Sequence, residues 1–202
     1  MTVAGKVLWR LASRYREARN KYFLLRFILL EAPGLNRLII GAKVRFEVPV
    51  RTSGLGFLTI GSENTFGYWA APRLGNGEIL LQPRNQEAAI SIGNKNAFNN
   101  NVTIIANERV SIGNGCQIGD QVSIYDSDFH EMAQKSRNRS HGLTKPVSIG
   151  DNVWLGSRVV VLKGVTIGDN SVIGAMSVVT RTIPANCIAV GVPAKIVRSL
   201  EP

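Results

Sequence analysis

Residues 147–183, VSIGDNVWLGSRVVVLKGVTIGDNSVIGAMSVVTRTI, repeat one pattern every six positions. Glycine follows four of the six recurring apolar residues, and a small or branched residue lies four positions after each of the six. A period of six matches neither an amphipathic helix, at ~3.6 residues per turn, nor an alternating strand. We therefore expect a solenoid with flat sides about one hexapeptide long, each with one apolar side chain pointing inward. The recurring residues are Ile149, Leu155, Val161, Ile167, Ile173 and Val179.

Three such sides make a coil of about 18 residues. This length predicts that Ile149 stacks over Ile167 and that Leu155 stacks over Ile173. Glycine at the corners is consistent with tight turns, because it tolerates positive φ and has no Cβ. The fold class that follows is an all-β solenoid, whose regular pattern ends after Val179, where Ile183-Pro184 breaks it.

Weaker copies of the pattern precede this stretch. Ile60-Gly61 opens one repeat and Ile92-Gly93 another, and the pattern then continues after a slip of two residues, with Ile112, Ile118 and Ile124 in register. The next inward position would be residue 130, but the pattern restarts only at Ile149. Residues 125–146 are therefore predicted to form a loop that leaves a corner of the solenoid. Such long loops are usually functional or disordered.

The repeat stretch resembles the hexapeptide-repeat acyltransferases. The phrase GVPAKIVR at residues 191–198 resembles the C-terminal signature of the same family, and the resemblance covers roughly residues 90–198. It implies a left-handed parallel β-helix that works as a trimer. We expect a basic amphipathic helical extension at residues 1–37, the β-helix at 38–183 with its inserted loop 125–146, and a C-terminal segment at 184–202 that flanks the cofactor groove.

The positive charge of the chain is concentrated at its N-terminus. Residues 1–51 hold eleven Lys or Arg and three Glu, whereas the rest of the chain is nearly neutral. Residues 5–31 are predicted to be helical, with an apolar run at Tyr22–Leu30 that Pro33-Gly34 ends. Such a helix can lie on an anionic membrane surface. Alternatively, it packs its apolar stripe on the solenoid, through Leu25, Ile28 and Leu29, or on a neighbouring subunit.

Several classes of protein are disfavoured by composition. Two cysteines, Cys116 and Cys187, suggest no disulfide framework, and Cys116 falls at an inward position. We identify no secretory signal and no apolar run long enough to span a membrane. We therefore expect a cytoplasmic protein, at most peripheral at the inner face of the membrane. The basic residues lack a nucleic-acid reader motif, so no nucleic-acid partner is expected.

His130 is the candidate general base. The chain has two histidines, His130 and His141, and both lie in the predicted loop. An imidazole titrates near pH ~6.5 and can accept a proton from a hydroxyl at neutral pH. From the residues alone, a solvated loop histidine is the favoured interpretation. The resemblance to galactoside and maltose acetyltransferases implies a catalytic histidine at the base of this loop, and His130 lies 27 residues before Ser157 of the VWLGS phrase.

The acceptor site is predicted from asparagines. Asn99-Asn100-Asn101 matches a family phrase in which an asparagine helps to hold the acceptor or acyl group, which implies Asn99 or Asn101, with Asn99 preferred. The alternative is an asparagine ladder at a corner of the solenoid. We also place Asp128, two residues before His130, in the acceptor-binding set. An acidic residue that contacts sugar in the family aligns near Asn107, a departure that argues against the same sugar acceptor.

The resemblance implies a coenzyme A groove along one edge of the solenoid. Ser157 and Ala175 are 18 residues apart and face the same way on successive coils, which follows from the period itself. Lys195 and Arg198 suit the phosphate groups of coenzyme A; the alternative for these two is solvated terminal charge. The implied cofactor-binding residues are Trp154, Ser157, Ala175, Thr180, Arg181, Lys195 and Arg198.

Together these features predict an acetyl-CoA-dependent O-acetyltransferase that acts on a saccharide, either a surface polysaccharide or a lipid-linked glycan, by direct transfer. N-acetylation of an amino sugar and a non-catalytic scaffold are the alternatives. A metal site like that of γ-class carbonic anhydrases is disfavoured, because it needs three histidines on different coils. We expect a homotrimer in which one subunit supplies the DSDFH loop and its neighbour supplies the edge with Trp154, Ser157 and Ala175.

Overall fold

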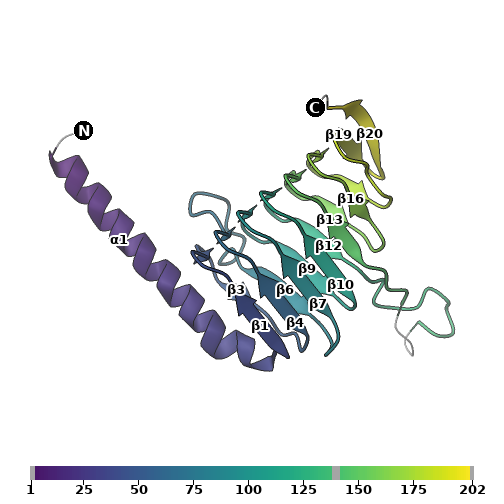
Figure 1. Cartoon of the computed structure of the whole chain (residues 1–202), viewed down its shortest axis with the longest axis horizontal. Helices are drawn as coiled ribbons and strands as arrows, with labels where there is room; N and C mark the ends of the chain where they lie inside the picture. The colour runs from purple at the N-terminus through teal and green to yellow at the C-terminus, as the bar shows by residue number, and fades with distance from the viewer. Residues whose placement is uncertain (1–2, 138–141, 201–202) are drawn as a thin grey trace.

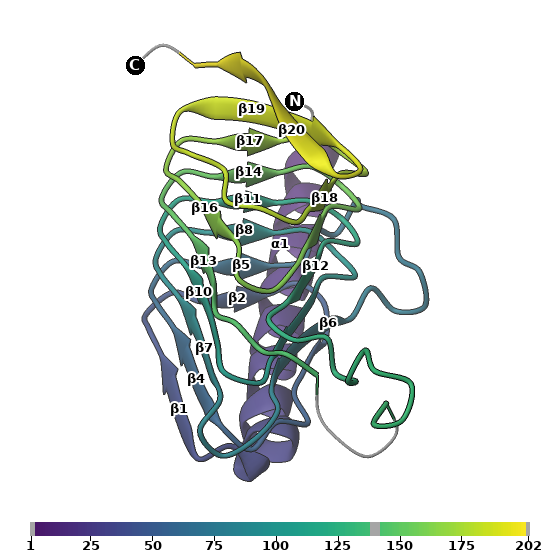
Figure 2. The ribbon, with the colours of Figure 1, turned by 90° about the vertical axis from the view of Figure 1, so that its right-hand side faces the viewer.

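The computed structural model describes residues 3–137 and 142–200. Three sheets of short strands form the sides of a solenoid, and the chain visits sheets A, B and C in turn (Figure 2). Sheet A contains β1 (Arg37–Ile40), β4 (Phe57–Ile60), β7 (Ala89–Ile92), β10 (Arg109–Ile112), β13 (Val147–Ile149) and β16 (Thr166–Ile167). Sheet B contains β2 (Arg45–Phe46), β5 (Thr65–Phe66), β8 (Ala97–Phe98), β11 (Gln117–Ile118), β14 (Trp154–Leu155), β17 (Val172–Ile173), β19 (Cys187–Gly191) and β20 (Ala194–Ser199). Sheet C contains β3 (Val50–Arg51), β6 (Ile79–Pro83), β9 (Thr103–Ala106), β12 (Ser123–Tyr125), β15 (Val160–Val161) and β18 (Val178–Val179).

The inward stacking predicted from the hexapeptide period is confirmed. Ile149 pairs in register with Ile167, and Leu155 pairs with Ile173, in parallel strands. All four side chains are buried in one continuous apolar core. The strands pair in parallel across successive coils because each coil repeats the inward position of the one before it.

Upstream coils are longer than 18 residues. Ile92 pairs with Ile112, twenty residues later, because β9 and β10 have four residues each where β15 and β16 have two. Ile60 pairs with Ile92, and residues 67–78 between β5 and β6 form the insertion that separates these two coils. The slip of two residues in the sequence pattern is therefore a longer passage from sheet C to sheet A.

The coil continues beyond Val179, where the regular sequence pattern ends. Ile183 is buried and forms a parallel bridge with Ile167, and β19 then adds to sheet B beside β17. β20 folds back antiparallel on β19 and closes this end of the molecule (Figure 1). Pro184 breaks the sequence period without ending the coil, because inward positions recur at Ile183, Cys187 and Ala189.

The opposite end is covered by the N-terminal helix α1 (Val3–Arg26), a π-helical turn (Phe27–Glu31) and a 3₁₀ turn (Ala32–Gly34). Phe27 is fully buried against Phe46, with ring centroids 5.4 Å apart. The rings of Phe46, Phe66 and Phe98 continue this stack through three coils. The aromatic column therefore joins the helical segment to the solenoid core.

The helix does not pack through the residues that the sequence suggested. Leu25, Ile28 and Leu29 are 56%, 43% and 60% exposed. Phe23 and Leu24 pack on the core instead, on the helix face that also carries Phe27. Polar contacts favour this face, because Arg19 and Asn20 both donate to the buried carboxylate of Glu47.

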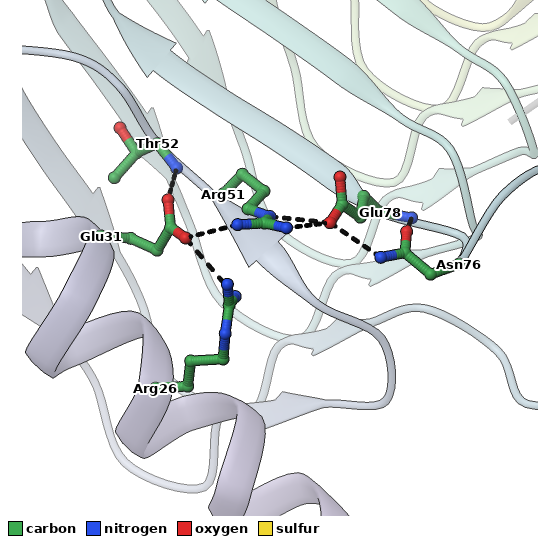
Figure 3. Close-up of polar contacts among 6 residues, drawn as sticks. All are labelled: Arg26, Glu31, Arg51, Thr52, Asn76 and Glu78. Carbon is green, nitrogen blue, oxygen red and sulfur yellow. Dashed lines mark hydrogen bonds and ion pairs between the residues drawn. The ribbon is translucent and has the colours of Figure 1, made fainter.

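A polar network joins the end of the helical segment to two coils (Figure 3). Glu31 accepts a hydrogen bond from Arg51 at 3.0 Å and pairs with Arg26 at 3.4 Å. Arg51 also donates from Nε to Glu78 at 2.7 Å, and Asn76 donates to the same carboxylate oxygen at 2.8 Å. The network therefore ties α1, β3 and the 67–78 insertion together.

Candidate active site

The sequence-predicted site residues lie at two different corners of the solenoid. The B–C corner follows the strands of sheet B, and the C–A corner follows the strands of sheet C. Asn99, Ser157 and Ala175 lie at the B–C corner. The inserted loop with His130 leaves the C–A corner after β12, on the side of sheet C (Figure 2).

The B–C corner is a tight column of backbone. Gly119 N–H donates to the Leu155 carbonyl at 2.8 Å, and Gly156 N–H donates to the Ile173 carbonyl at 2.8 Å. A Cβ on Gly156 would lie 2.6 Å from the backbone nitrogen of Ala175, so a side chain cannot be accommodated there. The column presents Ser157 and Ala175 to solvent on successive coils, in the same orientation.

The three asparagines at this corner have different roles. Asn100 is buried, and its side chain bonds Tyr68, Ala71 and Pro72 of the 67–78 insertion. Asn101 donates to Asp120 and to Pro72. These two hold the corner, as the ladder alternative anticipated. Within the described residues, only Asn99 of the three has a side-chain amide nitrogen without a protein acceptor.

Asn99 lines a cleft of about 330 Å³ on the outer face of sheet B. Trp154 forms part of its wall and is 55% exposed, and Gln117 and Tyr68 also contribute. An exposed tryptophan beside an unpaired amide gives the cleft both a flat apolar surface and a polar group for orientation.

Lys195 and Arg198 face the same side as Trp154. On β20, Lys195 lies opposite Val190 and Arg198 lies opposite Ile188, with a β-bulge between. Val190 and Ile188 are two residues apart and point away from the core, whereas Cys187 and Ala189 point inward. The bulge therefore brings two cations that are three residues apart onto one outer face, which a regular strand would not do.

Thr180 and Arg181 do not share this edge, which corrects the sequence-based expectation. They follow β18 on sheet C and lie at the C–A corner. Both are exposed. The six-residue period explains this position. Ser157 and Ala175 are one full coil apart and so share a corner, whereas Thr180 lies one side of the solenoid after Ala175.

A buried carboxylate anchors the start of the inserted loop. Asp126 is fully buried and accepts backbone hydrogen bonds at 2.8 Å from Asn107, Glu108 and Arg109. The two arms of the loop are joined by an antiparallel bridge between Ser127 and Thr144. The loop base is therefore fixed to the coil beneath it.

A tight turn precedes His130. Phe129 has a φ of +63°, and His130 N–H donates to the Asp128 carbonyl at 2.7 Å, which makes a γ-turn centred on Phe129. Such a backbone is strained for a bulky residue. The ring of Phe129 is held between Tyr125, at 5.7 Å between centroids, and the Arg84 guanidinium, at 4.9 Å.

Lys163, which the sequence analysis did not identify, pairs with Asp128. Its Nζ lies 2.6 Å from Oδ1, and both side chains are about one fifth exposed. Lys163 follows β15 on the next coil, so the ion pair joins the loop to the solenoid. The carboxylate predicted to bind acceptor thus has an in-chain partner, and acceptor binding by Asp128 stays a prediction.

The imidazole of His130 is exposed, with Nδ1 3.3 Å from the Arg137 carbonyl oxygen. Because a carbonyl can only accept, this contact places the proton on Nδ1 and leaves Nε2 as the basic nitrogen. His141 lies outside the described residues. Within residues 3–137 and 142–200, no group of three metal-ligating side chains comes together.

Comparison with known proteins identifies the family. Residues 146–181 match the family model described as bacterial transferase hexapeptide (six repeats). The Saccharomyces cerevisiae protein YJL218W, which is named for acetyltransferase activity, is 34% identical over 163 residues, covering 78% of this chain and 83% of the relative. The chain belongs to the hexapeptide-repeat acetyltransferase family. The match spans about half of some other relatives: Escherichia coli galactoside O-acetyltransferase is 42% identical over 112 residues, 55% of each chain.

Solved members of the family share the fold. The polysialic acid O-acetyltransferase OatWY superposes with a TM-score of 0.66 and 26% identity, covering 83% of this chain and 77% of its own. A galactoside acetyltransferase in complex with coenzyme A has a TM-score of 0.53 and 27% identity, covering 93% of this chain and 82% of its own. In the described part of this chain, the family fold is preceded by a helix that lacks the combined length and hydropathy needed to cross a membrane.

Proposed function

We propose that this protein is an acetyltransferase that moves an acetyl group from acetyl-CoA to a hydroxyl of a saccharide. The observation that carries the proposal is the anchored γ-turn that presents His130, whose Nε2 has no hydrogen-bond partner among the described residues. Backbone strain at a bulky residue is retained where the surroundings enforce it, and such sites are often functional. The turn lies in a chain of the hexapeptide-repeat acetyltransferase family, so acyl transfer is the chemistry it supports best.

The reaction we infer is direct transfer. Nε2 of His130 takes the proton of the acceptor hydroxyl while that oxygen attacks the thioester carbonyl carbon. The carbon–sulfur bond breaks, coenzyme A leaves as the thiol after taking a proton, and the acetyl ester remains on the acceptor. We propose that no acyl-enzyme forms, and the two cysteines are not available as nucleophiles for one, because both are buried.

The outer face of sheet B fits the acyl donor. Coenzyme A carries phosphate groups and an adenine ring, and this face offers the paired cations Lys195 and Arg198 and the exposed ring of Trp154. Ser157 and Ala175 lie beside it and are exposed at the B–C corner. Asn99 is the group we assign to acceptor or acyl binding within the cleft.

A complete site requires more than one subunit. His130, Thr180 and Arg181 belong to the C–A corner, whereas Asn99, Trp154 and Lys195 belong to sheet B and its B–C corner. We propose a homotrimer in which the C–A corner of one subunit faces the sheet B edge of the next, so that each of three sites combines both sets. The left-handed winding implied by the family is part of this proposal.

We infer that the acceptor is a surface polysaccharide or a lipid-linked glycan. The support is the likeness to OatWY, which acts on polysialic acid according to its name. Asn107 stands near the position where the galactoside enzymes carry an acidic residue, and its backbone N–H is used by Asp126. A different acceptor from simple galactosides is consistent with that difference.

Transfer of radiolabelled acetyl groups from acetyl-CoA to a panel of glycans and amino sugars tests the proposal. We expect acetyl esters on a polysaccharide acceptor, removed by mild base. Amide products on an amino sugar would show that the enzyme is an N-acetyltransferase and would contradict the proposed O-acetylation. No thermal stabilisation by coenzyme A at saturating concentration would favour a non-catalytic scaffold.

A further inference from the structure

α1 has two opposite faces. Asn20, Phe23, Leu24 and Phe27 face the first coil and are buried or packed on its core. On the other side, apolar residues recur at spacings of three and four, which places them on one face of a helix. This α1 stripe consists of Leu8, Leu11, Tyr15, Ala18, Tyr22 and Leu25.

The α1 stripe is open to solvent along its length. Leu8, Leu11 and Tyr15 are 67%, 57% and 68% exposed, and the π-helical turn continues the apolar surface with Ile28, Leu29 and Leu30. Figure 1 shows α1 diverging from the strands toward its N-terminus, so no part of the solenoid covers the stripe. A contiguous apolar face of this kind marks an interaction surface.

Basic side chains border the stripe on both sides. Arg10, Arg14 and Lys21 each precede a stripe residue by one position, and so lie about a quarter turn away. Arg19 and Arg26 follow stripe residues on the other border, where they pair with Glu47 and Glu31. Within the described part of the chain, Arg10 and Arg14 have no acidic partner.

The charge of these borders discriminates between occupants. The spacing would also suit a helix–helix seam with a second copy, in which flanking residues meet across the interface. A parallel pair would set Arg14 against Arg19 and Lys21 against Arg26, and an antiparallel pair would set Arg14 against Lys21. Each of these contacts places a cation beside a cation, although Arg19, Lys21 and Arg26 also pair with carboxylates of their own chain, so Arg14 carries most of the repulsion. An anionic surface, by contrast, matches the border with Arg10 and Arg14, which have no such partner in the described part of the chain.

We propose that the α1 stripe docks on the surface of an anionic lipid bilayer. The leucines enter the boundary between headgroups and acyl chains, and Tyr15 and Tyr22 lie at the level of the headgroups. Arg10, Arg14 and Lys21 contact lipid phosphates. The opposite face of α1 remains on the solenoid, so docking requires no unfolding. This surface is separate from both corners of the candidate active site, and the proposal does not depend on acyl transfer.

Co-sedimentation of the full-length chain with large unilamellar vesicles tests the proposal. We expect binding to phosphatidylcholine vesicles that contain phosphatidylglycerol, weaker binding at high salt, and little binding to phosphatidylcholine alone. Free inorganic phosphate should not compete at equal phosphate concentration, because the apolar stripe contributes to binding.

Two pairs of variants separate charge from apolar contact. Arg10→Glu/Arg14→Glu should weaken vesicle binding about tenfold or more. Lys95→Glu/Arg109→Glu makes the same change of net charge at exposed positions on later coils and should bind nearly as the parent. Leu11→Ser/Tyr22→Ser should also weaken binding, whereas Leu55→Ser/Leu74→Ser, at exposed positions elsewhere, should not.

Light scattering on the same variants measures the oligomer mass and tests whether the α1 stripe is instead a contact between copies of the chain. If the intact chain does not sediment with anionic vesicles, the proposal is overturned. If Leu11→Ser/Tyr22→Ser instead lowers the oligomer mass, the stripe is a contact between copies. Melting temperatures of all four variants should stay close to that of the parent chain, since none of the substituted residues is buried.

Discussion

The turn before His130 is held by side chains from three different coils. Arg84 follows β6, Asp126 follows β12 and Lys163 follows β15. Arg84 packs on the ring of Phe129, Asp126 fixes the loop base, and Lys163 pairs with Asp128. None of the three contacts the imidazole in the described structure. Together they hold the strained backbone in one conformation. The orientation of His130 is therefore fixed before an acceptor binds.

His130→Ala tests the general base. We expect kcat to fall by ~10²–10⁴, because the acceptor hydroxyl loses its proton acceptor in the transition state. The thermal shift caused by coenzyme A should be unchanged, because the imidazole lies at the C–A corner and the cations Lys195 and Arg198 lie on β20. Near-native turnover in this variant would make His130 a bystander.

Lys163→Met tests positioning through Asp128. The substitution keeps the aliphatic stem but leaves a mostly buried carboxylate without its cation, so the loop should loosen. We expect kcat to fall about tenfold, with little change in KM for acetyl-CoA. Lys163→Arg should retain most of the activity, because it keeps the charge. Equal losses in both variants would indicate that Lys163 acts only through packing.

At the scale of the structural element, the repeat explains what could be predicted. Ile149 and Ile167 were placed correctly because the same inward position recurs once per coil, eighteen residues later. Thr180 and Arg181 were assigned to the wrong edge because they were matched to the family signature by their order in the sequence. The six-residue period instead places them after β18, at the C–A corner. Lys163 carries no local signal, since its partner comes from a loop thirty-five residues earlier. The bulge that aligns Lys195 with Arg198 is likewise absent from any periodicity.

The network of Glu31, Arg51 and Glu78 should make stability depend on pH. Burial disfavours the charged form of Glu78, but hydrogen bonds from Asn76 and Arg51 outweigh it and lower the pKa of this carboxyl below 4.5. A lowered pKa in the folded state stabilises the fold above the unfolded-state pKa, and this stabilisation disappears as the pH falls through the folded-state pKa.

Glu78→Gln is the variant that measures this contribution. It should lower Tm by about 1–3 °C at neutral pH, a small effect because the side chain is 35% exposed. The difference in Tm from the parent should vanish once the pH falls below the lowered folded-state pKa of Glu78, where its carboxyl is protonated in both states. Scanning calorimetry from neutral to acidic pH measures it, and a difference that persists at low pH would contradict the assignment to charge.

At the scale of the whole molecule, the solenoid separates the two halves of its candidate site. Each coil contributes to both corners, so neither half can move toward the other without unwinding the core. The aromatic column at one end and the β19–β20 hairpin at the other close the stack. If the site combines both halves as proposed, one isolated chain cannot complete it, and association of rigid subunits is the simplest way to bring the halves together.

Mixing two inactive variants tests that arrangement. His130→Ala disables the C–A corner, and Lys195→Glu/Arg198→Glu disables the sheet B edge of the same chain. In a trimer whose sites form between neighbours, equal mixing of subunits leaves about one quarter of the sites with both halves intact. We expect activity near that fraction after co-expression, and almost none from either variant alone. Light scattering should give three times the 22.0 kDa chain mass for every sample. If the co-expressed variants stay inactive while the trimer forms, each site lies within one subunit and the shared-site proposal is wrong.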